Sequence, residues 1–150
     1  MSKTYAIREF ETKDYGALMY VWEETGIGSK ARGDDLGIIE QTLRLGGKLW
    51  VAELPDSDKV VGTAWLTYDG RRLHLHHIGV LPEYRRRGIG RDLTKKAISY
   101  AKKQQMQIKL EVHASNKDAI AIYERLGFNR LGDYDIYIIR SFESMGGNVF

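Results

Sequence analysis

The residues best suited to chemistry lie in a short run of arginine and glycine, RRRGIG, at residues 85–90. The run follows an apolar, strand-like segment, Leu73 to Leu81, and opens an amphipathic segment with helical spacing. Backbone N–H groups at a helix start have no partner within the helix, and glycines allow a ligand to approach them closely. Three arginines surround these N–H groups, so the run predicts a site for a phosphorylated ligand.

Two common phosphate-binding motifs do not fit this run. The P-loop pattern GxxxxGK[ST] is absent from the sequence. A dinucleotide-binding GxGxxG would need a third glycine where Leu93 stands. The pattern present is RxxGxG on a strand-to-helix turn.

Titratable side chains lie on the strand-like segments before and after the run. His74 and His76 share one face of the earlier segment by period-two alternation, and histidine has a pKa suited to moving protons near neutral pH. Glu111 alternates with apolar neighbours on the later segment, so an exposed strand carboxylate is the plain alternative to a catalytic one. His77 is expected to be a surface or packing residue.

The elements that must position these residues follow from hydrophobic periodicity and from capping residues. Their order is strand, two helices, three strands, helix, strand, helix, strand. This order predicts an α+β (mixed α/β) fold with a central mixed sheet of six or seven strands and about four helices. The expected strands are Tyr5–Phe10, Leu49–Leu54, Val60–Tyr68, Leu73–Leu81, Ile108–Val112 and Tyr134–Phe142, and the helices begin near Asp14, Asp34 or Asp35, Gly88 and Asn116.

Composition is that of a globular protein, with 43% hydrophobic and 29% charged residues in 150. We expect one domain over residues 1–150, with the glycine-rich stretch 144–150 as a flexible tail. The absence of cysteine excludes thiol nucleophiles, disulfides and thiolate metal sites. No stretch approaches the ~20 apolar residues of a membrane span, and the first ten residues lack a signal-peptide core, so we expect a cytoplasmic protein.

The arginine–glycine run and its flanks resemble the acetyl-CoA loop of the GCN5-related N-acetyltransferases (GNAT superfamily), whose pattern is [QR]xxGx[GA]. A second block, LEVHASNKDAIAIYERLGF from Leu110 to Phe128, is similar to the family's "N..A...Y...GF" signature. This block closely resembles that of the ribosomal-protein alanine N-acetyltransferases. Both motifs occur in the family's order and spacing.

The resemblance implies a sheet whose fourth and fifth strands splay apart, with acetyl-CoA between them as co-substrate and no metal. It implies an N-acetyltransferase that passes an acetyl group directly to a primary amine in a ternary complex. The amine would belong to a small molecule or to a protein N-terminus. The implied acetyl-CoA-binding residues are Ile78, Gly79, Val80, Arg85, Arg86, Arg87, Gly88, Ile89, Gly90, Arg91 and Asn116.

The same resemblance assigns catalytic roles. Tyr123 aligns with the family's general acid, whereas its helical spacing alone would make it a core residue. Glu111 occupies the place of the base in the ribosomal-protein enzymes. His74 and His76 match a pair that relays the amine proton in the arylalkylamine N-acetyltransferases. Both sets are kept as candidates for the base, acting directly or through water.

Two other functions stay open at this point. A non-catalytic acyl-CoA-binding domain would keep the arginine–glycine run without needing Tyr123. A nucleic-acid binder would need a continuous basic face, which interspersed acids and a net charge of only +3 disfavour, so neither nucleic acid nor membrane is an expected partner. Trp22, with the acids near residues 23–24 and 34–35, forms either an acceptor wall or ordinary helix surface. A homodimer is left open, and the sequence does not identify the acceptor.

Overall fold

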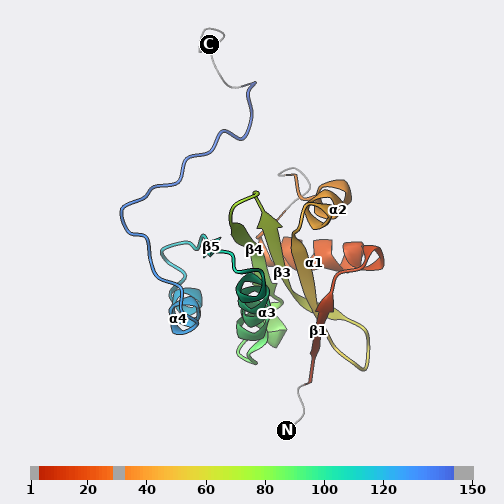
Figure 1. Ribbon diagram of the computed structural model, residues 1–150. Helices are drawn as coiled ribbons and strands as arrows, with labels where there is room; N and C mark the ends of the chain where they lie inside the picture. The colour runs from red at the N-terminus through yellow and green to blue at the C-terminus, as the bar shows by residue number, and fades with distance from the viewer. Residues whose placement is uncertain (1–3, 29–32, 144–150) are drawn as a thin grey trace.

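The computed structural model describes residues 4–28 and 33–143. Five strands form one sheet in the order β1-β2-β3-β4-β5, antiparallel except between β4 and β5. The mixed α/β class is confirmed, with four α-helices in the described part of the chain (Figure 1). The elements are β1 (Ala6–Glu9), η1 (Thr12–Asp14), α1 (Tyr15–Thr25), α2 (Leu36–Arg44), β2 (Lys48–Glu53), β3 (Val60–Tyr68), β4 (Leu73–Val80), η3 (Pro82–Tyr84), α3 (Ile89–Gln104), β5 (Ile108–Leu110) and α4 (Lys117–Arg125).

The helices begin and end at residues that satisfy their free backbone groups. The Asp35 carboxylate accepts a hydrogen bond from the Ile38 N–H at 2.9 Å at the start of α2. The Asn116 side chain does the same for α4 through the Ala119 N–H, at 3.3 Å. Gly26 follows α1 with φ of 69°, a left-handed conformation that glycine adopts without steric cost. Capping therefore explains why these boundaries could be predicted to within a residue or two.

Helices cover the two faces of the sheet separately. On one face, Trp22 of α1 is fully buried and stacks on Trp65 of β3, with ring centroids 5.5 Å apart. On the other face, the buried side of α3 contains Leu93 and Ala97. There α3 lies so close to β3 that a Cβ built on Gly62 would approach Leu93 to 3.2 Å. The two groups of candidate functional side chains described below lie on opposite faces of the sheet.

Strands β4 and β5 part after a short stretch of parallel pairing. Only Leu73–Leu75 pairs with Ile108–Leu110, while β4 continues to Val80. Next to the parting, His77 has a positive φ of 49° at a shift in the β3–β4 register. A non-glycine residue pays for this conformation, and the buried Thr63 hydroxyl supports it by donating to the His77 carbonyl at 2.9 Å. The splayed fourth and fifth strands that we expected are therefore present, with a bulge that was not expected.

The expected last strand is wrong for this structure. Tyr134–Phe142 is extended and highly exposed, and it pairs with no strand of the described sheet. Figure 1 shows this blue segment leading away from the helices and the sheet. Alternating apolar residues favour an extended chain, but a strand also needs an edge to supply its hydrogen bonds, and the chain carries this segment away from β5. The sheet thus has five strands in the described residues, where six or seven were expected; the expected tail, 144–150, lies outside those residues.

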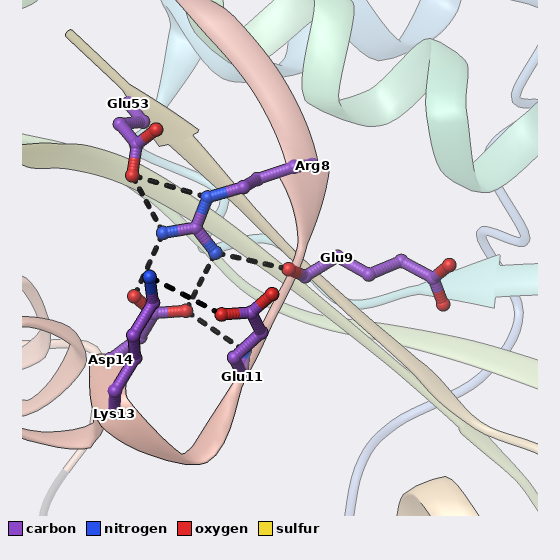
Figure 2. A network of polar contacts seen from close by, with 6 residues as sticks. All are labelled: Arg8, Glu9, Glu11, Lys13, Asp14 and Glu53. Atoms are coloured by element: carbon purple, nitrogen blue, oxygen red, sulfur yellow. Dashed lines mark hydrogen bonds and ion pairs between the residues drawn. The ribbon is translucent and has the colours of Figure 1, made fainter. Parts of the chain in front are cut away.

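One charge network ties the start of the chain to the sheet (Figure 2). The Arg8 guanidinium donates two hydrogen bonds to Asp14, at 2.7 and 2.8 Å, and two to Glu53, at 2.6 and 3.1 Å. Hydrogen bonds from Arg8 lower the pKa of the Asp14 carboxyl, which is only 6% exposed. Because Arg8 lies on β1, Asp14 on η1 and Glu53 on β2, the network fixes the entry to α1 against the edge of the sheet.

Replacing Arg8 by Met is expected to lower the free energy of unfolding by roughly 2–4 kcal/mol, because the buried Asp14 would lose its cation. Urea unfolding should show a lower midpoint with an unchanged slope. Lys48→Met is the control: Lys48 forms a more exposed pair with Glu9 at 2.7 Å, and its loss should cost less than about 1 kcal/mol. Equal losses in the two variants would contradict the special role of the network.

Candidate active site

A cavity of about 700 Å³ opens where β4 leaves β5. Its walls come from the end of β4, from η3, from the arginine–glycine run and the first turn of α3, and from the start of α4. Every residue predicted from the sequence to bind a ligand lines it, except Gly79 and Arg87. The candidate acid Tyr123 lines the same cavity. Segments about 40 residues apart in the sequence thus meet around one space, as the family's pattern implied.

The run from Arg85 to Gly90 presents a helix N-terminus to this cavity. The first hydrogen bond of α3 runs from the Asp92 N–H to the Gly88 carbonyl, at 3.0 Å. The amides of Ile89, Gly90 and Arg91 come before this bond and so belong to the helix start, where N–H groups have no acceptor within the helix. Gly88 has φ of 85°, and a Cβ there would lie 2.8 Å from the Arg91 guanidinium. Glycine at this position therefore allows both the left-handed backbone turn and the close approach of the Arg91 side chain.

The arginines of the run have different surroundings. The Arg85 Nε donates to the Val80 carbonyl at 3.0 Å, which fastens the run to the end of β4. Arg86 lines the cavity. Arg87 instead stacks over the Tyr84 ring, 5.1 Å from its centroid, and donates to the Glu83 carbonyl at 3.3 Å. Arg87 therefore does not line the cavity, and its expected binding of acetyl-CoA stays a prediction.

Gly79 does not line the cavity, and a side chain built there would face the opposite side of β4; its expected binding through backbone groups stays a prediction. A Cβ at this position would collide with the Ile27 side chain and lie 3.1 Å from the Thr25 hydroxyl. Its glycine is thus required by close packing against the end of α1. Its neighbours Ile78 and Val80 line the cavity, and neither is paired with β5.

Tyr123 reaches the cavity from α4, whose start is fixed by the Asn116 cap. Burial raises the pKa of the Tyr123 phenol to about 12. The Phe128 ring packs edge-on against it, with centroids 6.0 Å apart. The phenol therefore keeps its proton throughout the neutral range and can donate it only to a strong base formed nearby.

A second cluster lies on the opposite face of β4, where His76 and Trp65 contact each other (centroids 6.1 Å apart). It joins the two sets of candidate bases that the sequence left as alternatives. The His74 and His76 rings lie 3.8 Å apart, and the Glu111 carboxylate is 3.8 Å from His74 Nε2. His76 Nε2 lies 2.8 Å from the Thr67 hydroxyl. Glu111 and both histidines are therefore neighbours, outside the lining of the cavity.

Burial favours the neutral form of both histidines. Burial, reinforced by the neighbouring histidines, lowers the pKa of His76 to about 3. Burial also lowers the pKa of His74, although Glu111 acts in the opposite direction. A neutral imidazole has one donor and one acceptor nitrogen, so it can pass a proton onward without holding charge.

His77 is a packing residue, which is one of the two roles expected for it, but its bulge and its contact with Asp34 were not predicted. Because of the bulge, its ring packs against Trp22 and Trp65, at 4.6 and 5.1 Å between centroids, and its Nε2 lies 3.1 Å from the Asp34 carboxylate. Asp34 is 7% exposed. Trp22 was expected either in an acidic and aromatic acceptor wall or on ordinary helix surface, and both expectations are wrong for it, because it is buried in the core. Period-two alternation gave no signal for the bulge or for the contact between Asp34 and His77.

Tyr5 and Asp92 form a second contact that the sequence did not indicate. The Tyr5 hydroxyl donates to Asp92 at 2.6 Å, and the other Asp92 oxygen lies 3.4 Å from Arg91 Nε. Burial and this hydrogen bond raise the pKa of Tyr5 to about 12. The residue before β1 thus supports the first turn of α3, next to the cavity.

Two further findings concern the described residues as a whole. None of their helices is long and apolar enough to cross a membrane. In the same ranges, no group of three or more histidine, aspartate or glutamate side chains is arranged to hold a metal ion.

Comparison with known sequences gives two results. The profile of the acetyltransferase (GNAT) family matches residues 5–128. An N-acetyltransferase of Methanocaldococcus jannaschii, itself named as uncharacterized, is 53% identical over 55 residues, which cover 36% of this chain and 24% of that protein. The chain therefore spans about a quarter of the curated relative that it matches.

Solved structures of acetyltransferases also superpose on this chain. A GNAT-family acetyltransferase of Staphylococcus aureus superposes with a TM-score of 0.73 at 25% identity, over 87% of this chain and 89% of that one. The ribosomal-protein-S18-alanine N-acetyltransferase of Escherichia coli gives 0.66 at 28% identity, over 83% and 77%.

The low pKa of His76 predicts a specific loss of stability in acid. Between pH 6.5 and about 3 the unfolded chain binds a proton that folded His76 does not, so the free energy of unfolding falls as pH falls, by up to about 1.4 kcal/mol per pH unit. His76→Gln should reduce the difference in stability between pH 7 and pH 4.5 by about 2 kcal/mol. Urea unfolding at the two pH values measures this, with exposed His113→Gln as control. An unchanged difference in His76→Gln would refute it.

Proposed function

Because this chain belongs to the acetyltransferase (GNAT) family, we propose that it transfers an acetyl group from acetyl-CoA to a primary amine. One observation carries the proposal. The helix start of α3, with its arginines, and the Tyr123 phenol line the same cavity of about 700 Å³. An anion site and a proton donor around one space are what transfer from a phosphorylated thioester requires.

The donor side is formed by the cavity. The amides of Ile89, Gly90 and Arg91 would bind the pyrophosphate, with Arg86 adding charge. Asn116, which already caps α4, also lines the cavity and has an amide group for the pantetheine arm. The edge of β4 at Ile78 and Val80, which β5 leaves unpaired, would hold the same arm by backbone hydrogen bonds.

The acceptor side is the opposite face of β4. His74, His76 and Glu111 gather there, separated from the cavity by the strand that borders the parting. An amine that approaches from this face would meet the acyl group in the opening between β4 and β5. Aligning the two reactants in this way supplies much of the catalysis, because direct attack needs no covalent enzyme intermediate.

Acetyl-CoA supplies an activated acyl carbon on a thiol leaving group. The amine nitrogen forms the new C–N bond as the C–S bond breaks. Glu111 accepts the amine proton, through the neutral His74 and His76 or through water, and Tyr123 donates a proton to the departing sulfur. The products are an amide and the free thiol, and later proton exchange with solvent restores both side chains.

The acceptor is a primary amine of a small molecule or of a protein N-terminus. The Escherichia coli structural neighbour is named for an alanine of ribosomal protein S18, which favours an N-terminal amine among the two. The Glu111 carboxylate lies 3.8 Å from His74 Nε2. It would attract a cationic amine and then receive its proton.

Gly88→Ala is expected to weaken CoA binding at least tenfold, because a Cβ at φ of 85° strains the turn and meets Arg91. Titration calorimetry with CoA measures the dissociation constant. Gly70→Ala is the matched control, since Gly70 has a φ of 93° but lies in the β3–β4 turn, away from the cavity. Both variants should lose stability, and only Gly88→Ala should lose CoA affinity. Intact affinity in Gly88→Ala would remove the phosphate assignment.

Tyr123→Phe should lower kcat by about 100-fold while CoA affinity stays within twofold, because only the proton donor is lost. The assay incubates the protein with acetyl-CoA and a panel of amines and N-terminal peptides, and reads thiol release. Tyr20→Phe, at an exposed position on α1, should keep the native rate. If CoA binds but no amine causes thiol release, the chain is a non-catalytic acyl-CoA-binding domain. If the Tyr123→Phe variant keeps the native rate, Tyr123 has only a packing role.

Glu111→Gln should lower kcat by about 100-fold at pH 7, and the rate should recover as rising pH deprotonates the amine in solution. His76→Gln should lower kcat without moving the pH–rate profile between pH 6 and 9, because native His76 is already neutral there. Steady-state kinetics across this range separate the two effects. A native profile and rate in both variants would leave bulk water as the base.

A further inference from the structure

A cation that the proposed chemistry does not use lies within the acceptor-side cluster. Lys109 is the middle residue of β5, and the parallel register places it beside His74 of β4. By period-two alternation its side chain points to the face opposite that of Ile108 and Leu110. Its Nζ lies 4.0 Å from the Glu111 carboxylate, which is itself 3.8 Å from His74 Nε2. Glu111 therefore has a histidine and a lysine as neighbours.

The two charges at this end of the cluster nearly cancel. Burial lowers the pKa of His74 and of His76, and Lys109 acts in the same direction on both. At neutral pH a glutamate is negative and a lysine is positive, so Glu111 and Lys109 form a pair of opposite charges. Their side chains are 45% and 48% exposed, so an acceptor can reach both of them. The acceptor face thus offers a carboxylate that already has an ammonium group beside it.

This pairing disfavours an acceptor that carries only positive charge. A cationic amine that binds Glu111 takes the place of Lys109 and lies next to the displaced ammonium, and like charges repel at this distance. A second cation on the acceptor increases the repulsion. A carboxylate close to the amine removes it, because the carboxylate pairs with Lys109 while the amine pairs with Glu111. One ion pair of the free protein is then exchanged for two in the complex, and no charge is left unpaired.

We propose that Lys109 selects acceptors in which the primary amine lies close to a carboxylate. This inference rests on the proposed function, in which Glu111 binds the amine. Free amino acids carry both groups on one carbon, and a protein N-terminus carries them when an acidic residue is at or next to its first position. Polyamines lack the carboxylate and are poor acceptors. Lys109 determines specificity and takes no proton in the reaction.

Binding of acceptors to the CoA-loaded protein tests this preference without turnover. Titration calorimetry compares peptides that begin with alanine and carry glutamate, glutamine or lysine next, and it compares glycine with glycinamide. The native protein should bind the glutamate peptide, or glycine, at least about tenfold more tightly than its partner with a lysine or an amide. Lys109→Met should reduce the preference to less than about threefold, and Lys109→Glu should reverse it. A preference confined to the peptides identifies a protein N-terminus as acceptor, and one confined to glycine identifies a free amino acid.

The control variant is Lys103→Met, which removes one positive charge at an exposed position on α3 and should keep the native preference. Circular dichroism shows that each variant is folded. A native protein that binds none of these acceptors, binds all of them equally, or keeps its preference in Lys109→Met overturns the role of Lys109. Thiol release with the same acceptors separates the two failures. Transfer without a carboxylate preference rejects Lys109 alone, whereas absence of transfer rejects the proposed function and leaves the binding ratios to decide the role of Lys109.

Discussion

The parting of β4 from β5 is the constraint on which the rest of this structure depends. Three residue pairs in parallel register hold the strands together at one end, and β4 has a bulge at His77 beyond them. The buried Thr63 hydroxyl and the aromatic rings of Trp22 and Trp65 keep His77 in its costly conformation. Because the strands part, the end of β4 at Ile78 and Val80 lines a cavity instead of pairing with β5.

Much of this arrangement could be predicted from the sequence because it depends on local chemistry. Asp35, Asn116 and Gly26 mark helix ends through hydrogen bonds or a backbone angle that span only a few residues. The arginine–glycine run forms its helix start for the same reason. The likeness to a known family then added what spacing could not supply, namely that the run and Tyr123 face one space.

The features that sequence reasoning missed all depend on contacts between distant segments. Alternation has no means of showing that one extra residue at His77 shifts the register, nor that Asp34 would then lie beside it. It placed His74 and His76 on one face correctly, but Glu111 joins them only through the parallel register of β5. For Tyr134–Phe142, alternation indicates an extended chain but does not show whether any strand edge pairs with it.

Tyr5 connects the amino-terminal end of the chain to α3, a contact that the sequence did not indicate. It is bonded to Asp92 at the first turn of α3, while Arg8, three residues later, is locked to Asp14 and Glu53. Strand β1 therefore links the entry to α1 with the first turn of α3, next to the arginine–glycine run. Fraying of this strand would release both ends at once, so amide hydrogen exchange in β1 and in the first turn of α3 belongs to one cooperative opening unit, although more than 80 residues of chain separate them.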